Sequence, residues 1–135
     1  MNYWLLKTEP SEYSYANLEE KKKAVWDGIT NPLALKYIKG MKKDDLAFIY
    51  HTGDEKQIIG IATITGGAYP DPKDDTGKLS VVDVAPKQKF KKPVALSAIK
   101  SKKEFADWEL VRMGRLSVVP VDEARWKLLK KMGGL

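Results

Sequence analysis

The sequence predicts an α+β fold: a mostly antiparallel sheet of about six strands that curls into a barrel and is flanked by short helices. Short runs rich in β-branched and aromatic residues recur along the chain and mix with a few short helical segments. Their order is unlike the regular strand–helix alternation of parallel α/β proteins. We expect one domain, residues 1–135, because no repeat, low-complexity tract or linker divides the chain.

Six runs carry the strand signal, and turn-forming residues separate them. Pro10 stops the first run, and TGDEKQ forms a hairpin between the second and the third. Pro93 and several lysines mark the fifth run as an edge strand, since proline cannot donate to a sheet ladder. The predicted strands are residues 3–7, 46–52, 58–65, 79–85 and 89–96, with a last one within 112–121 that is entered through Gly114.

Capping residues define the predicted helices. Ser14 and Asp122 stand where a side-chain oxygen can accept a hydrogen bond from the first free N–H groups of a helix. Asn31 before Pro32 combines an N-cap residue with proline at the first helical position, and Gly40 ends that helix. The predicted helices are residues 15–22, 32–39 and 97–109, with a final one between Asp122 and Gly133.

The composition excludes some chemistries and is compatible with a polyanionic partner. There are no cysteines, so disulfides, thiol nucleophiles and cysteine-based zinc sites are excluded. The net charge of +6 suits a nucleic acid, although a merely solubilising surface accounts for it equally well. No apolar run approaches the roughly 20 residues of a membrane span, and the opening run is unlike a signal peptide. We therefore expect a cytoplasmic protein, associated with the nucleoid in a prokaryote.

Motifs for catalysis and metal binding are not evident. His51 is the single histidine, no serine lies in a G-x-S-x-G elbow, and no phosphate-loop pattern occurs. DPKDD (71–75) lacks the Gly-then-Glu spacing of a calcium loop. We expect no catalytic residue, metal or cofactor. An enzyme built on this chain would depend on Glu9, Asp27 and His51, its only candidate acids and bases.

Aromatic residues give a stronger indication of function, because two of them stand where a ligand pocket could form. Trp4, Trp108 and Trp126 lie in strand or helix patterns typical of core residues, whereas Trp26 and Tyr50 each end an apolar run where polar residues begin. Aromatic faces beside polar groups suit a planar base, because stacking contributes about 1–3 kcal/mol per base and the polar groups read its edge. The alternative for Trp26 and Tyr50 is a core position followed by a turn.

Several segments, taken in order, resemble the EVE domain, a family of the PUA-like superfamily. The most specific are the opening Y-W-L-x-K-[ST]-E-P, the turn W-D-G-[VI]-x-N and the strand end Y-H-[ST]. The matching segments are YWLLKTEPSEYS (3–14), VWDGITN (25–31), MKKDDLAFIYHT (41–52), IIGIATI (58–64), AYPDP (68–72) and GRLSVVPV (114–121). The resemblance implies a PUA-like pseudo-barrel, similar to YTH domains, which hold a methylated adenine in an aromatic cage.

The resemblance also implies a function and a site. The chain would be a non-catalytic reader of a modified base, particularly a modified cytosine in DNA, flipped out of the stack. The pocket walls would be Lys7, Thr8, Glu9, Tyr13, Trp26, Asp27, Gly28, Thr30, Asn31, Tyr50, His51 and Thr52, with a floor of Leu116, Ser117 and Val119. Contacts to the phosphate backbone would come from Lys36, Lys39, Lys89, Lys91, Arg112 and Arg115.

Two departures from the family pattern bear on the ligand. Thr30 stands where the family usually has arginine, and Pro32 where it usually has a larger polar or aromatic residue. The segment 32–39 also lacks a second arginine often found there. Lys36 and Lys39 supply charge but cannot copy a planar, bidentate guanidinium. In this interpretation Trp26 is a pocket wall, so its truncation should leave folding nearly intact and abolish binding.

Other functions remain open from the sequence. An enzyme acting on a nucleotide or a small acidic metabolite is one alternative, and an RNA-binding accessory domain is another. A protein-interaction module is less favoured, since the sequence has no broad exposed apolar stripe. We expect a monomer that binds modified DNA rather than RNA, with no membrane partner.

Overall fold

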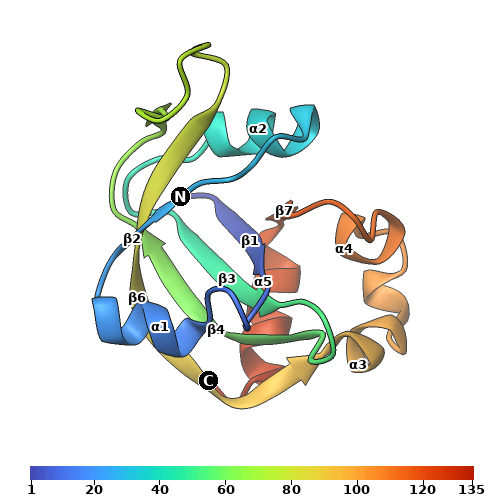
Figure 1. Cartoon of the computed structure of the whole chain (residues 1–135). Coiled ribbons are helices and arrows are strands. Elements are labelled where there is room, and N and C mark those ends of the chain that lie inside the picture. The colour runs from blue at the N-terminus through green and yellow to red at the C-terminus, as the bar shows by residue number, and fades with distance from the viewer.

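A curled mixed sheet forms the framework of the protein, whose residues 1–135 are all described by a computed structural model (Figure 1). The strands are β1 (Tyr3–Thr8), β2 (Ala24–Trp26), β3 (Leu46–His51), β4 (Gln57–Ile64), β5 (Tyr69–Pro70), β6 (Ser80–Ala95) and β7 (Val118–Val121). Their order is β2-β6-β4-β3-β1-β7, and β5 pairs with β6. Only β1 and β3 run parallel. The predicted α+β class and its mostly antiparallel, curled sheet are confirmed.

Short helices flank this sheet. They are α1 (Tyr15–Lys21), α2 (Pro32–Lys39), α3 (Leu96–Lys100), the 3₁₀ turn η1 (Lys103–Phe105), α4 (Glu109–Arg112) and α5 (Glu123–Met132). The three predicted N-caps are confirmed, because Ser14, Asn31 and Asp122 each accept a hydrogen bond from a backbone N–H in the first turn. No helix combines the length and the apolar character needed to cross a membrane.

Two element predictions are wrong. The runs at 79–85 and 89–96 join into the single strand β6, which pairs with β4 along most of its length. The predicted helix 97–109 is broken into α3, η1 and α4. Ile99 and Phe105 are both 0% exposed, yet six residues of a continuous helix would place them on different faces. The chain therefore bends so that both side chains reach the core.

Irregular pairing and close packing shape the sheet. The register between β4 and β6 shifts twice, and such bulges increase local twist. On one face Tyr15 of α1 lies against Gly60 of β4, where an added Cβ would be 2.7 Å from the Tyr15 ring. On another, α5 packs through Trp126, which stacks on Phe48 of β3 with ring centroids 3.9 Å apart. These contacts hold the sheet in its curled form.

The buried Asp45 carboxylate joins the starts of β1 and β3. It is 3% exposed and accepts hydrogen bonds from the Asn2 N–H at 3.0 Å, the Trp4 indole N–H at 3.1 Å and the Lys42 N–H at 3.0 Å. The Leu46 N–H also donates to the Asn2 carbonyl, at 3.3 Å. Asp45 thereby sets the position of β1 along β3.

We expect Asp45→Asn to lower the free energy of unfolding by about 2–3 kcal/mol, because an amide turns an N–H donor toward groups that need an acceptor. The adjacent Asp44→Asn is the matched control, since Asp44 is exposed and asparagine tolerates its φ of 74°. Denaturant unfolding of both variants checks this. Equal midpoints for the two variants would show that the Asp45 contacts do not stabilise the fold.

Candidate functional site

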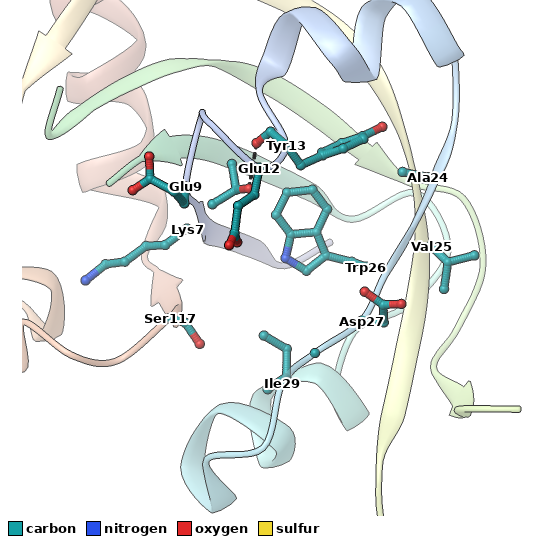
Figure 2. A pocket seen from close by; sticks show the side chains of 12 residues that line it. Lys7, Glu9, Glu12, Tyr13, Ala24, Val25, Trp26, Asp27, Ile29 and Ser117 are labelled. Atoms are coloured by element: carbon teal, nitrogen blue, oxygen red, sulfur yellow. Dashed lines mark hydrogen bonds between the residues drawn. The ribbon is translucent and has the colours of Figure 1, made fainter. Parts of the chain in front are cut away.

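A cavity of about 470 Å³ opens at the carboxyl end of β1. The loop after β1, the strand β2 with its following turn, and the residue just before β7 enclose it (Figure 2). Its volume lies within the roughly 300–1,000 Å³ typical of small-ligand sites. The lining residues are Lys7, Thr8, Glu9, Glu12, Tyr13, Ala24, Val25, Trp26, Asp27, Gly28, Ile29 and Ser117.

Trp26 is both a wall of this cavity and a member of the buried core. Only 7% of its surface is exposed, and its main chain is held by the pairing of β2 with β6. Unlike the indole N–H groups of Trp4 and Trp108, that of Trp26 makes no hydrogen bond within the protein, and Figure 2 shows it facing the open space between Glu12, Ser117 and Ile29. Trp26 thus lines the cavity as expected and also belongs to the core, so the two positions do not exclude each other.

Tyr13 supports the indole from the side. Its ring meets Trp26 edge-on, with centroids 6.3 Å apart and planes at 81°. Its hydroxyl is buried without a hydrogen-bond partner, and burial raises the pKa of this phenol. The Thr8 hydroxyl donates to the Tyr13 carbonyl at 2.7 Å, which fixes the loop after β1. Tyr13 thus contributes an apolar ring rather than a polar contact.

The polar groups of the cavity divide into bonded and free ones. Glu9 accepts hydrogen bonds from the Ser11 N–H at 3.3 Å and from the Ser11 hydroxyl at 3.1 Å. The side chains of Glu12, Asp27 and Ser117 make no hydrogen bond within the protein and border the open part of the cavity (Figure 2). Carboxylates only accept, whereas a hydroxyl also donates. The cavity therefore offers both acceptors and donors to a ligand.

Lys7 is the single cation of the lining. Its Nζ donates to the Gly114 carbonyl at 2.9 Å and lies 5.6 Å from the centroid of the Tyr50 ring. No carboxylate pairs with it, and burial lowers the pKa of this ammonium below its usual value. A half-buried charge without a counter-ion is unfavourable, so Lys7 is available to an anionic ligand.

The third wall expected from the Y-H-[ST] strand end lies outside this cavity. His51 is 5% exposed, its Nε2 accepts a hydrogen bond from the Tyr15 N–H at 3.0 Å, and its Nδ1 lies 3.0 Å from Glu55 Oε1. Tyr50 and Thr52 line a neighbouring hollow instead. His51 thus anchors α1 to β3, and neither of its ring nitrogens is free for a ligand.

Four more expected pocket residues also lie elsewhere. The Asn31 oxygen accepts from the first N–H groups of α2, and Asn31 and Leu116 line a separate hollow of about 310 Å³. Thr30 is exposed but outside the lining. Val119 is 0% exposed and pairs with Leu5 inside the sheet. Three of these residues, Thr30, Asn31 and Leu116, are close in the chain to lining residues but lie outside the cavity.

None of the six residues expected to contact phosphate lines the cavity. Arg115 lines the hollow beside Asn31, and Arg112 donates to the Asp107 carbonyl at 3.3 Å. The remaining four are exposed on α2 and β6: Lys36, Lys39, Lys89 and Lys91.

Sequence reasoning also missed four residues of the lining: Glu12, Ala24, Val25 and Ile29. Each lies within three residues of Tyr13 or Trp26 in the chain. Proximity in the chain does not single them out, because Thr30 is next to Ile29 in the chain and lies outside the lining.

The cavity has no evident metal site. No three His, Cys, Asp or Glu side chains anywhere in the protein lie close enough together to hold a metal ion. The donor set of the cavity instead suits an organic ligand with both donors and acceptors on its edge.

Solved structures share this fold along the whole chain. A protein from Rhodopseudomonas palustris, solved by NMR, is 42% identical with a TM-score of 0.94, over 99% of this chain and 94% of that one. The crystal structure of the human THYN1 protein in complex with DNA containing 5-methylcytosine is 25% identical with a TM-score of 0.91. It covers 100% of this chain and 99% of that one.

Relatives found by sequence carry the name thymocyte nuclear protein 1. Thymocyte nuclear protein 1 of Mus musculus is 32% identical, over 74% of this chain and 56% of the relative. The chain thus spans little more than half the length of the curated relatives that it matches. The model of the EVE domain matches residues 2–132. The chain therefore belongs to the EVE domain family.

Proposed function

We propose that this chain is a non-catalytic DNA-binding domain that reads a modified cytosine, turned out of the duplex into the cavity beside Trp26. The observation that carries the proposal is the free indole N–H facing the same space as the free Glu12 carboxylate (Figure 2). The human relative of the same fold, solved with DNA containing 5-methylcytosine, supports this ligand.

The free groups of the cavity complement the edge of cytosine. Cytosine presents an amino group at position 4, which a carboxylate accepts, and acceptors at N3 and O2. Glu12 would accept from the amino group, while the Trp26 N–H and the Ser117 hydroxyl would donate to the acceptors. The Ile29 side chain offers an apolar surface to a 5-methyl group.

The same arrangement would discriminate against thymine. Thymine carries the same methyl group as 5-methylcytosine but has a carbonyl at position 4, which would face the Glu12 carboxylate. Two acceptors placed together leave both groups without a partner, and a site built for a hydrogen bond strongly rejects such an analogue. Glu12 would therefore act as the specificity determinant of the cavity.

A catalytic role has less support. His51 has neither ring nitrogen free, so the only histidine does not provide a base in the cavity. Glu9 is engaged by the hydroxyls of Ser11 and Thr52. The remaining free groups are suited to recognition of a base edge.

Trp26→Phe should keep the ring and lower affinity for 5-methylcytosine DNA by about tenfold, because one hydrogen-bond donor is lost. Trp26→Ala should abolish the preference and also destabilise the fold by about 3–5 kcal/mol, since the indole belongs to the core. Fluorescence titrations of matched duplexes carrying cytosine, 5-methylcytosine, 5-hydroxymethylcytosine or N6-methyladenine measure the preference.

Trp126→Phe is the matched control for these titrations, since Trp126 is a buried tryptophan away from the cavity. It should change stability and leave base preference intact. A Trp26→Phe variant that binds all four duplexes like the unaltered protein would contradict the proposed role of the indole N–H.

Glu12→Gln should reduce the preference for 5-methyl-2′-deoxycytidine over thymidine by about tenfold, because an amide can both donate and accept. NMR titration with the two nucleosides measures this preference without any phosphate. Glu20→Gln removes the same charge from an exposed site outside the cavity and should leave the preference unchanged. If both variants discriminate like the unaltered protein, Glu12 does not read position 4.

A further inference from the structure

The candidate base cavity is poorly suited to hold a phosphate. Its lining carries three carboxylates, Glu9, Glu12 and Asp27, against the one ammonium of Lys7. Like charges at such close range repel. A nucleotide whose base enters the cavity must therefore leave its phosphate outside, where the protein offers positive charge.

A second hollow, of about 260 Å³, shares Lys7 with the cavity. Lys7, Lys56 and Lys100 line it together with Tyr50 and Leu110, and no acidic side chain belongs to its lining. Because Lys7 borders both spaces, the basic hollow adjoins the acidic cavity. Glu9 lies at the border of the hollow, where its Oε2 accepts a hydrogen bond from the Thr52 hydroxyl at 3.3 Å. The lining of the hollow itself is cationic, whereas that of the cavity carries three carboxylates against one ammonium.

The three lysines come from separate parts of the chain. Lys7 is the last residue but one of β1, Lys56 immediately precedes β4, and Lys100 ends α3. The Leu96 N–H, at the start of α3, donates to the Lys56 carbonyl at 2.8 Å, which fixes the last two segments against each other. Tertiary folding therefore assembles the cluster, and no single basic run of the sequence contains more than one of the three lysines.

None of these three ammonium groups has a carboxylate partner. Unpaired charges of one sign around a single hollow repel one another, and an anion placed among them relieves that repulsion. The one hydrogen bond that Lys7 makes leaves two of its N–H groups free. The cluster therefore has both the charge and the free donors that a phosphate requires.

We propose that the hollow lined by Lys7, Lys56 and Lys100 binds the DNA backbone phosphate next to the base held in the cavity. This inference rests on the proposed base-reading function. Lys7 joins the two subsites, with its ammonium between base and phosphate. Lys56 and Lys100 hold the phosphate from the far side, and the half-buried side chain of Val111 borders the sugar.

The test compares ligands with and without a phosphate. NMR titrations use 5-methyl-2′-deoxycytidine, its 3′- and 5′-monophosphates, and inorganic phosphate. The variant is Lys56→Ala/Lys100→Ala, and the matched control is Lys21→Ala/Lys131→Ala, which removes two exposed, unpaired lysines outside both spaces. Salt-dependent titrations with 5-methylcytosine duplex DNA complete the set.

The unaltered protein should bind one monophosphate about tenfold more tightly than the nucleoside. The Lys56/Lys100 variant should lose that gain and keep its affinity for the nucleoside. With duplex DNA, its affinity should depend less steeply on salt. The magnitude of the slope of log affinity against log salt should decrease by about one for each lysine removed. The control variant should keep the monophosphate gain.

Two outcomes overturn the inference while the base-reading function stands. In the first, the Lys56/Lys100 variant binds the nucleoside, both monophosphates and DNA like the unaltered protein. In the second, it loses the monophosphate gain but keeps the salt slope of the control with DNA, so the hollow binds a terminal phosphate of a free nucleotide and not the DNA backbone.

A third outcome rejects the base-reading function itself. If no nucleoside binds, and inorganic phosphate shifts the NMR signals of the hollow only while Lys56 and Lys100 are present, an anion site exists. The base-reading function is then rejected, and the role of the hollow beside a bound base is rejected with it.

Discussion

Two hydrogen bonds to the buried Asp45 carboxylate, from the Asn2 N–H and the Trp4 indole N–H, fix where β1 lies along β3, and a third from the Lys42 N–H holds Asp45 in the turn before β3. These strands are parallel, so no hairpin turn can set their register. From the Tyr3–Leu46 pair the strands run four residues, about 13 Å at roughly 3.3 Å per residue, to the Lys7–Tyr50 pair. A slip of one residue would turn Lys7 to the opposite face. The cavity and the basic hollow both depend on this register, since Lys7 borders both.

Charge separates the two spaces beside Lys7. The cavity combines Trp26 with free carboxylates, which match an amino group on a base, and the adjoining hollow is lined by three lysines that form no salt bridge. In the proposed function a base enters the first and a phosphate lies in the second. Recognition of the base is then short-range and insensitive to salt, whereas affinity for the backbone weakens as salt rises. The net charge of +6 alone does not locate either function.

Much of the fold could be predicted because its signals are local. Ser14, Asn31 and Asp122 are N-caps, since a cap needs only its own helix. The helix expected at 97–109 failed because the burial of Ile99 and Phe105 overrides local propensity. Of the candidate site, the loop after β1, the turn around Trp26, and Ser117 do lie together. His51, from the equally specific third motif, is engaged by the backbone N–H of Tyr15 and lies outside.

The sequence by itself determined the kinds of element, their caps, the family motifs and the absence of thiol chemistry. Only the tertiary structure decided which motif residues share a cavity, that Trp26 is at once core and wall, and that Lys7, Lys56 and Lys100 share one hollow. The physical reason is that caps and turns depend on neighbours within a few residues. A site depends instead on strand register and on the packing of distant segments, which no local pattern contains.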